Sequence, residues 1–227
     1  MKNKRVQITE YRVEKNIFLH FLGVFVFCVI ALTGCIPHQT NNIDSVGTDI
    51  ICFGDSLTFG YGVEAGQDYP TLLSQLLNKP VINAGVDGDT TVDAVKRLEK
   101  DVIERNPLLV IVEFAGNDFL EKVPMEKTLS NMDYIIKKVQ AKGAMVAVVD
   151  CSAGMLLREY HAAFHELAKE NNTIFIPQVL SGIITDSRLK SDFLHPNANG
   201  YAIIAQRIYR GIIPHLNRNQ LSRSSAK

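Results

Sequence analysis

Residues 49–58 read DIICFGDSLT, a short apolar run that stops at a glycine and is followed at once by small polar residues. A continuous apolar run of this length, bounded by turn residues, is typical of a strand buried on both faces of a sheet. In open parallel sheets, ligands gather beyond the carboxyl ends of the strands. This stretch therefore predicts both a central strand and the place where chemistry is expected.

Similar apolar runs recur along the chain and alternate with segments whose apolar residues have helical spacing. Further strands are predicted at residues 81–82, 108–114, 144–149 and 173–176. Helices are predicted at residues 69–77, 91–105, 125–142, 153–170 and 197–213. This alternation predicts an α/β fold of three layers (α/β/α), in which right-handed crossovers build a flavodoxin-like sheet of five parallel strands.

The composition is that of a folded protein without an electrostatic preference for nucleic acid. The 227 residues are 46% hydrophobic, enough for a sizeable core, and 24 basic side chains balance 24 acidic ones. A balanced charge provides none of the basic surface that nucleic-acid binding requires. We therefore expect one domain with an additional segment, and no nucleic-acid partner.

The first 34 residues have the order of a secretory signal peptide: a basic start, then an apolar stretch, IFLHFLGVFVFCVIAL, at residues 17–32. Residues 32–35 read LTGC and resemble a bacterial lipobox, in which the cysteine is diacylated and becomes the first residue after cleavage. We expect Cys35 to be lipidated and the protein to be an extracytoplasmic lipoprotein of the cell membrane or outer membrane. An uncleaved transmembrane anchor is the alternative, because residues 17–36 supply about the 20 residues that a span needs.

The remaining boundaries follow from composition. Residues 35–47 are polar, with proline, asparagine and glycine, and are predicted to form a tether. Residues 48–216 are predicted to form the folded domain, and residues 217–227 a polar, frayed tail. Cys52 and Cys151 lie in or beside apolar runs and are predicted to be buried thiols rather than a disulfide.

Polar residues suited to acyl transfer occur in four segments, three of them directly after predicted strands. A serine hydroxyl becomes an effective nucleophile when a neighbouring base takes its proton, and Ser56 follows the first strand. His195 is the candidate base, and Asp192 precedes it closely enough to orient its ring and stabilise its charged form. We expect Ser56, Asp192 and His195 to form a catalytic triad.

The tetrahedral intermediate of acyl transfer also needs hydrogen-bond donors aimed at its oxyanion. The candidates are the backbone amides of Ser56 and Gly88 and the side-chain amide of Asn117. A glycine at position 88 lets the backbone approach closely, and Gly85 in the same segment is the alternative.

Three other features have competing interpretations. His161 and His165 have the i, i+4 spacing of a metal-binding pair, but no third ligand is evident, so we favour an exposed helix face and expect no metal or cofactor. Glu113 lies in an apolar strand. It is either a group that supports Asn117 from nearby or a hydrogen-bonded carboxylate with a structural role. Residues 155–157 either line an acyl pocket or form an ordinary helical turn.

The motifs FGDSLT, NAGVDGDT, GND and DFLHP occur in this order and resemble those of the SGNH (GDSL) hydrolase family. The likeness covers the chain from residue 49 to about residue 216 and resembles the bacterial thioesterase, lysophospholipase and arylesterase branch. It implies the SGNH hydrolase fold and a serine esterase without a cofactor, with Ser56 as nucleophile. It also implies Asp192 and His195 as partners of Ser56, and an oxyanion hole that includes Gly88 and Asn117.

We therefore expect a hydrolase of carboxylic esters or thioesters that acts through an acyl-enzyme on a small-molecule or lipid substrate. An acyltransferase that passes the acyl group to a glycan or lipid would use the same residues and is an alternative. A surface lipoprotein that binds a ligand with an inactive site is a second alternative. The sequence determines neither the acyl-chain length nor the oligomeric state, for which a monomer is expected.

Overall fold

The computed structural model describes residues 40–152 and 158–225. The described residues belong to one compact unit, and the first 39 residues lie outside the described residues. The predicted signal peptide with its lipobox and the candidate pocket residues 155–157 therefore lie outside the described residues. Within the part of the chain that is described, no helix combines the length and apolarity needed to cross a bilayer.

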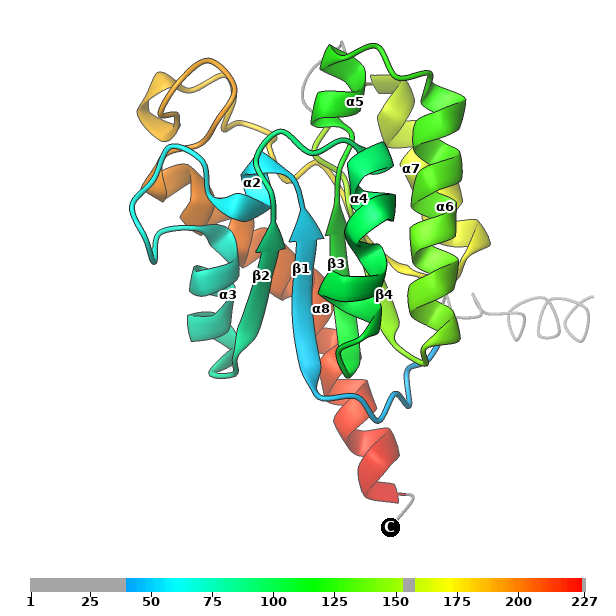
Figure 1. Cartoon of the computed structure of the whole chain (residues 1–227). Coiled ribbons are helices and arrows are strands. Elements are labelled where there is room, and N and C mark those ends of the chain that lie inside the picture. Colours follow the sequence, from blue (N-terminus) through cyan, green and yellow to red (C-terminus); the bar gives the residue numbers. More distant parts are fainter. Residues whose placement is uncertain (1–39, 153–157, 226–227) are drawn as a thin grey trace, which may run out of the picture. The chain divides into compact units, whose positions relative to one another are not determined.

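Five parallel strands form the central sheet, in the spatial order β2-β1-β3-β4-β5 (Figure 1). The strands are β1 (Asp49–Gly54), β2 (Val81–Gly85), β3 (Pro107–Glu113), β4 (Met145–Val149) and β5 (Ile174–Ile176). β3 and β4 are buried along their whole lengths, which explains why their sequences are continuously apolar. The predicted five-stranded parallel α/β fold is confirmed.

Helices cover both faces of this sheet. They are α2 (Ser56–Phe59), α3 (Tyr69–Leu77), α4 (Thr91–Leu98), α5 (Gly116–Leu120), α6 (Met125–Ala141), α7 (Arg158–Glu170) and α8 (Ala198–Ser225). A π-helical turn (Glu99–Ile103) continues α4, and a 3-10 turn (Ser187–Leu189) follows β5.

Alternate side chains of each strand enter two separate hydrophobic cores. In β1, Ile50 and Cys52 pack with α3 and α8, whereas Ile51 and Phe53 pack with α4, α6 and α7. This division follows from the two-residue period of a strand, which sends neighbouring side chains to opposite faces. The carboxyl ends of the strands are therefore held rigidly between two helical layers.

Residues 40–47 pack on the domain, so the predicted boundary at residue 48 is too late in the chain. Thr40 and Ser45 are only 2% and 5% exposed. The Asn42 side-chain amide donates to two backbone carbonyls between the end of α6 and the start of β4, at 2.8 and 2.9 Å. These are polar contacts with distant parts of the chain, and composition alone gives no indication of them.

The carboxyl-terminal helix also differs from the prediction. α8 continues through Pro214 to Ser225, where the sequence predicts a frayed tail from residue 217. Asn219 is 2% exposed, and its side-chain amide donates to two backbone carbonyls of the segment 40–47, each at 2.9 Å. The two ends of the domain therefore order each other, because each supplies hydrogen-bond partners that the other lacks.

Candidate active site

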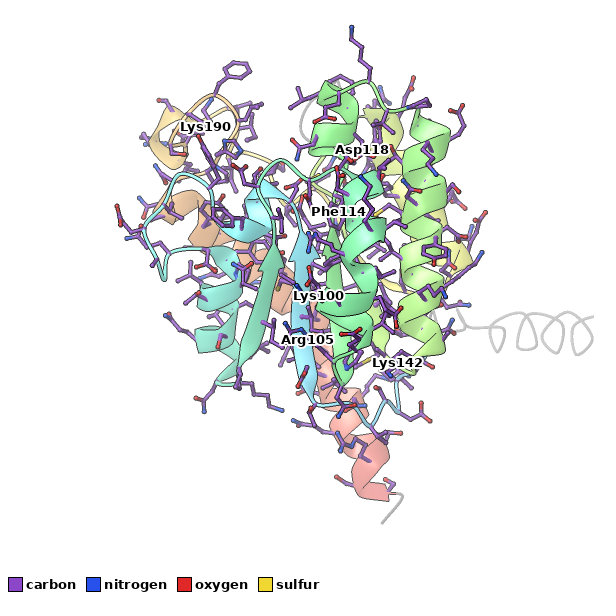
Figure 2. All side chains as sticks on the ribbon, in the orientation of Figure 1. Lys100, Arg105, Phe114, Asp118, Lys142 and Lys190 are labelled. Carbon is purple, nitrogen blue, oxygen red and sulfur yellow. The ribbon has the colours of Figure 1, made fainter. Side chains whose placement is uncertain are left out.

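The carboxyl ends of β1, β2 and β3 meet at the upper edge of the sheet in Figure 1. The strand order changes direction between β1 and β3, and such a switch point is where doubly wound sheets bind ligands. Gly54 at the end of β1 pairs with Gly85 of β2 and with Glu113 of β3. The segments that follow these strands therefore begin side by side. Figure 2 shows Asp118 and Lys190, from two later segments, at the same end of the domain.

Ser56 begins α2 directly after β1. Asp55 caps this helix, since its carboxylate accepts a hydrogen bond from the Leu57 amide at 3.0 Å. At the other end, Gly60 adopts a φ of 93° and its amide donates to the Ser56 carbonyl. The short helix is thus held at both ends, and Ser56 is only 7% exposed.

The structure brings together the three residues of the predicted triad. Ser56 Oγ lies 3.0 Å from His195 Nε2, and His195 Nδ1 lies 2.8 Å from Asp192 Oδ2. The ring of Tyr61 packs against the His195 imidazole, with 4.4 Å between the ring centroids. In this arrangement the imidazole can accept a proton from the serine while the carboxylate holds the ring's other nitrogen.

The Asp192 carboxylate is held ready for this role by its own loop. It accepts hydrogen bonds from the backbone amides of Leu194 and His195, both at 2.7 Å. Burial alone would raise the pKa of Asp192, but these amides and the His195 ring outweigh it, and the pKa lies below its ordinary value. The carboxylate therefore stays ionised at neutral pH and can stabilise a positively charged imidazole.

A closed turn explains why a separation of three residues is enough for the Asp192–His195 pair. The Ser191 amide donates to the His195 carbonyl at 3.0 Å, which closes the loop on itself. The Asn197 side-chain amide donates to the Lys190 carbonyl at 3.3 Å and fixes the loop to the start of α8. Asp192 and His195 are therefore held together by one local structure.

The geometry separates the two candidate oxyanion glycines. A side chain at Gly85 would meet the backbone nitrogen of Phe59 at 2.1 Å, and the Gly85 amide already donates a hydrogen bond to the Asn83 side-chain oxygen at 2.9 Å. Gly88 has a φ of 82° and open space around it, and its amide has no partner among the residues that the structure describes. Gly85 is thus required for packing against α2, whereas the Gly88 amide is available to a ligand.

Asn117 reaches this place from the segment after β3. Its side-chain Nδ2 donates to the Asp89 carbonyl at 2.9 Å, which links the segments after β3 and β2 and leaves the second amide hydrogen for a ligand. Ala115, just before α5, has a φ of 115°, a value that a non-glycine residue rarely adopts. Backbone strain of this kind is concentrated at functional sites.

Asp118 anchors the turn that carries Asn117. It is fully buried, and its carboxylate accepts hydrogen bonds from the Thr91 amide at 2.8 Å, the Thr91 hydroxyl at 2.5 Å and the Thr128 hydroxyl at 2.9 Å. Asn131 completes the network by donating to the Thr91 hydroxyl at 3.0 Å. This network ties α5 to the first turns of α4 and α6, and so sets the position of Asn117.

Arg97 is a site-supporting residue that sequence reasoning missed. Its guanidinium donates to backbone carbonyls near the ends of β1 and β2, at 2.9 and 2.8 Å, and pairs with the Asp89 carboxylate at 2.5 Å. Its Cζ lies 4.4 Å from the centroid of the Phe53 ring. The sequence contains one indication that Arg97 faces the sheet: it lies three residues after the buried Ala94, and residues three apart share one face of a helix.

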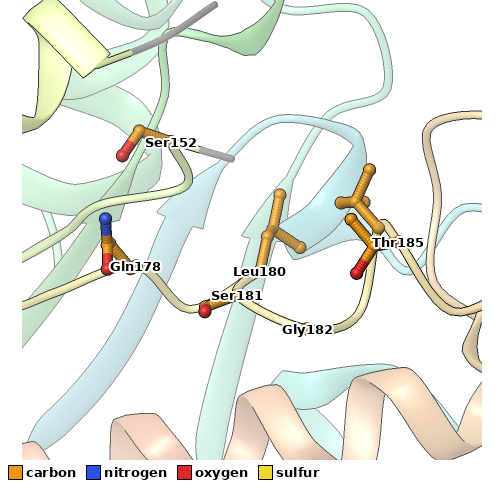
Figure 3. Close-up of a pocket in the computed structure, with 7 residues that line it drawn as sticks. Ser152, Gln178, Leu180, Ser181, Gly182 and Thr185 are labelled. Atoms are coloured by element: carbon orange, nitrogen blue, oxygen red, sulfur yellow. The ribbon is translucent and has the colours of Figure 1, made fainter. Parts of the chain in front are cut away.

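A cavity of about 280 Å³ lies at the carboxyl ends of β4 and β5 (Figure 3). Its lining residues are Ser152, Gln178, Leu180, Ser181, Gly182, Ile184 and Thr185. Leu180 belongs to the same hydrophobic cluster as Leu57, the residue that follows Ser56. Leu180 and Ile184 give this cavity apolar surface beside four polar side chains, which suits the acyl or alkyl part of an ester.

Large apolar side chains are exposed in all four segments that carry candidate site residues. They are Phe59, Tyr61, Val86, Phe119, Leu120, Phe193 and Leu194. Phe193 is 83% exposed although it lies only two residues before His195. A concentration of exposed apolar side chains marks a surface that binds an apolar ligand or partner.

The other sequence candidates have structural partners. His161 Nδ1 lies 2.6 Å from the buried Asp150 carboxylate, and His165 lies on the exposed side of the same helix. No group of three potential metal ligands occurs in residues 40–152 and 158–225. Cys52 and Cys151 are buried free thiols, which confirms that prediction.

A Ser–His–Asp array at the switch point of a doubly wound sheet is the arrangement of a serine-type hydrolase. The chain belongs to the GDSL-like lipase/acylhydrolase family, whose family model matches residues 52–203. It is 28% identical to an arylesterase of Vibrio mimicus, over 74% of this chain and 89% of that protein. It is 27% identical to thioesterase 1/protease 1/lysophospholipase L1 of Escherichia coli strain K12, over 75% of this chain and 86% of that protein.

Two further proteins resemble this chain. The structure of the esterase EstA from Pseudoalteromonas sp., inhibited by monoethylphosphonate, matches with a TM-score of 0.68 and 26% identity, over 75% of this chain and 99% of that chain. An uncharacterized lipoprotein of Bacillus subtilis, YqeF, is 27% identical over 117 residues, which are 45% of this chain and 48% of that protein. The family and its named esterases make this chain an ester hydrolase.

Proposed function

We propose that this esterase acts through an acyl-enzyme formed on Ser56. As Ser56 Oγ attacks the ester carbonyl carbon, His195 Nε2 takes the hydroxyl proton and then gives it to the departing alcohol when the ester C–O bond breaks. Water then attacks the acyl carbonyl carbon and gives its proton to His195, and the bond between that carbon and Ser56 Oγ breaks, which releases the carboxylic acid while His195 returns the proton to Ser56. The observation that carries this proposal is the continuous array of hydrogen bonds from Ser56 through His195 to Asp192.

The oxyanion that forms during both attacks needs donors already in place. We assign this role to the backbone amides of Ser56 and Gly88 and to the second side-chain hydrogen of Asn117. The free Gly88 amide and the bond from Asn117 to Asp89 support this assignment, because Gly88 and Asn117 follow β2 and β3, the two strands that flank β1. No metal or organic cofactor enters the proposed reaction.

A phosphonate probe tests the nucleophile directly, since the related EstA is inhibited by monoethylphosphonate. We expect a fluorophosphonate to add once per chain, on the peptide that contains Ser56, and to abolish hydrolysis of p-nitrophenyl butyrate in parallel. Label on another serine of an active preparation would contradict the assignment. Product analysis with an added sugar alcohol would measure what share of the acyl group is transferred to an acceptor instead of water.

The proposed substrate class is an ester with an apolar acyl or alkyl group. The exposed apolar side chains around Ser56 and the apolar cavity lined by Leu180 and Ile184 support this class. A fully polar acetylated substrate would leave these surfaces uncovered, at an unfavourable hydration free energy. The chain-length profile of p-nitrophenyl esters measures the preference directly.

We also propose that the protein is an extracytoplasmic lipoprotein anchored through Cys35. The lipobox-like residues 32–35 and the partial likeness to the lipoprotein YqeF support this proposal. Wild-type protein should take up radioactive palmitate, and Cys35→Ser should take up none. Equal labelling of the two would favour the alternative, an uncleaved transmembrane anchor.

The position of the first described residues suggests how a lipid anchor at Cys35 would orient the active site. The segment from Thr40 runs along the amino ends of the strands, shown in blue at the lower end of the sheet in Figure 1, opposite to Ser56. A tether from Cys35 to Thr40 spans at most about 18 Å. A unit of this size is about 40 Å across. We therefore propose that the active site faces away from the anchoring membrane and acts on esters in the adjoining aqueous space.

Lengthening the tether tests this orientation. Full-length lipidated protein in phosphatidylcholine vesicles should hydrolyse p-nitrophenyl butyrate in solution at the same rate with or without 20 Gly-Ser residues inserted after Gln39. Such an insert spans about 25 Å on average and can extend much further, so only the lengthened protein should reach p-nitrophenyl palmitate dissolved in its own bilayer. Equal rates on the bilayer ester would show that the site already reaches the membrane.

A further inference from the structure

Two buried carboxyl groups lie at the strand ends from which the Ser56 segment begins. Asp55 immediately precedes the serine and is 2% exposed, and Glu113 ends the neighbouring strand β3 and is 1% exposed. Glu113 is the sheet partner of Gly54, the residue before Asp55, so the two carboxyl groups occupy adjacent positions at the ends of neighbouring strands, and each shifts the pKa of the other. Neither takes part in the proposed acyl transfer, so their burial needs a separate explanation.

One oxygen of this pair lacks a regular partner. Glu113 Oε2 accepts from the Thr58 hydroxyl at 3.0 Å, and Thr58 in turn meets the Tyr69 hydroxyl at 2.8 Å. Glu113 Oε1 is buried and has no hydrogen bond of regular geometry to any described residue. Asp55 Oδ1 accepts from the Leu57 amide, which leaves Oδ2 free to carry a proton. A proton there is the donor that the Glu113 oxygen lacks.

The surroundings provide no positive charge for a doubly ionised pair. Arg97 is bound to the Gly54 carbonyl and the Asp89 carboxylate instead, and no ion pair to either carboxyl group is found among the described residues. The titratable groups that face the pair are acidic or neutral. They are Cys52 of β1, Tyr69 of α3, Asp118 of α5, Cys151 after β4 and Tyr201 of α8.

We propose that Asp55 and Glu113 share one proton and that this singly charged pair positions Ser56 for attack. Through Asp55 the pair holds the amide of Leu57, and through Glu113 it holds the hydroxyl of Thr58. It therefore fixes the two residues that follow the serine in α2. Both are positioning residues, because they act through this helix and touch no substrate. Only the activity measurement below depends on the proposed role of Ser56.

The proposal has a defined pH dependence. Burial and then the charge of Glu113 raise the pKa of Asp55 well above its ordinary value, and burial raises the pKa of Glu113. A group whose pKa is raised by folding stabilises the fold fully below its unfolded-state pKa, and this contribution is lost as the pH rises through the folded-state pKa. Between those two values, each pH unit shifts the unfolding equilibrium about tenfold toward the unfolded state.

Melting temperatures across the pH range test the shared proton without reference to activity. In Asp55→Asn, the new amide donates to Glu113 and cannot titrate. Its melting temperature should therefore rise relative to wild type by roughly 3–5 °C for each pH unit above the unfolded-state pKa of the two carboxyl groups, until the pair has lost its proton. Glu104→Gln, which removes an exposed carboxylate, should run parallel to wild type. Parallel curves for wild type and Asp55→Asn would overturn the proposal.

Hydrolysis of p-nitrophenyl butyrate tests the positioning role. Asp55→Ala removes both the cap and the proton, and its kcat should fall about 10- to 100-fold through misplacement of Ser56. Asp55→Asn should recover most of this loss and lack the fall in kcat that wild type shows at alkaline pH. Asparagine no better than alanine would refute the positioning role. If no ester is hydrolysed at all, the proposed function fails, but the melting temperatures still decide whether the pair shares a proton.

Discussion

Replacing Ser56 with alanine is expected to lower kcat for p-nitrophenyl butyrate by roughly 10⁴-fold or more. The alanine methyl group cannot accept the acyl group, so no acyl-enzyme forms. The remaining rate would come from the oxyanion donors acting on direct attack by water. KM should change little, because the Ser56 hydroxyl makes its one side-chain hydrogen bond to His195 and lines no part of the cavity.

Ser45 provides the matched control for this substitution. It is also a buried serine, 5% exposed, but it lies at the amino ends of the strands, where its hydroxyl accepts a hydrogen bond from the Gly47 amide at 3.4 Å. Ser45→Ala should keep kcat within about threefold of wild type, because this serine lies away from the reacting array. Equal activity of wild type and Ser56→Ala, with both proteins folded, would rule out Ser56 as the nucleophile.

The second large effect is expected for Asp192→Asn, which should lower kcat about 10³- to 10⁴-fold. An asparagine oxygen can still accept from the Leu194 and His195 amides, so the loop should keep its shape. Its amide nitrogen would then face His195 Nδ1, which the carboxylate meets at 2.8 Å in the wild type. The ring would carry its proton on Nε2 and could no longer accept one from Ser56.

Asp186→Asn is the control, since Asp186 is another loop aspartate paired with a basic side chain, Arg188 at 2.7 Å. It should leave kcat within about twofold of wild type, because exposed ion pairs contribute little.

The lowered pKa of Asp192 adds a further expectation. Its carboxylate should remain ionised well into the acid range. Protonation of Asp192 should therefore cause no loss of kcat at mildly acidic pH, either in wild type or in Asp186→Asn. A mere two- or threefold loss in Asp192→Asn would show that the tautomer is set by something else.

The strands could be predicted from the sequence because a strand buried on both faces must be apolar at every position. LLVIVEF in β3 and AMVAVV before and within β4 meet this requirement, and the structure places both strands inside the sheet. The boundaries were predicted less well. Residues 40–47 and the end of α8 are polar, and they are ordered by hydrogen bonds from Asn42 and Asn219 to distant carbonyls.

The candidate site divides in the same way. Ser56, Gly88, Asn117 and the Asp192–His195 pair could be named from the sequence because each follows a predicted strand or precedes the last helix. Their supporting residues could not. Arg97 is an ordinary helix arginine in the sequence, and only the fold places it over Phe53 with two strand-end carbonyls within reach.

By itself, the sequence determined the alternation of strands and helices, the parallel sheet, and the residue types at the ends of its strands. These are local properties, since hydrophobic periodicity and turn residues act over a few positions. Only the tertiary structure decided which of those residues meet. Ser56 and His195 are 139 positions apart in the sequence, and the distance between them depends on how α8 packs across the sheet. The burial of Asp55 against Glu113 likewise depends on β1 pairing with β3, a contact between strands that no local pattern records.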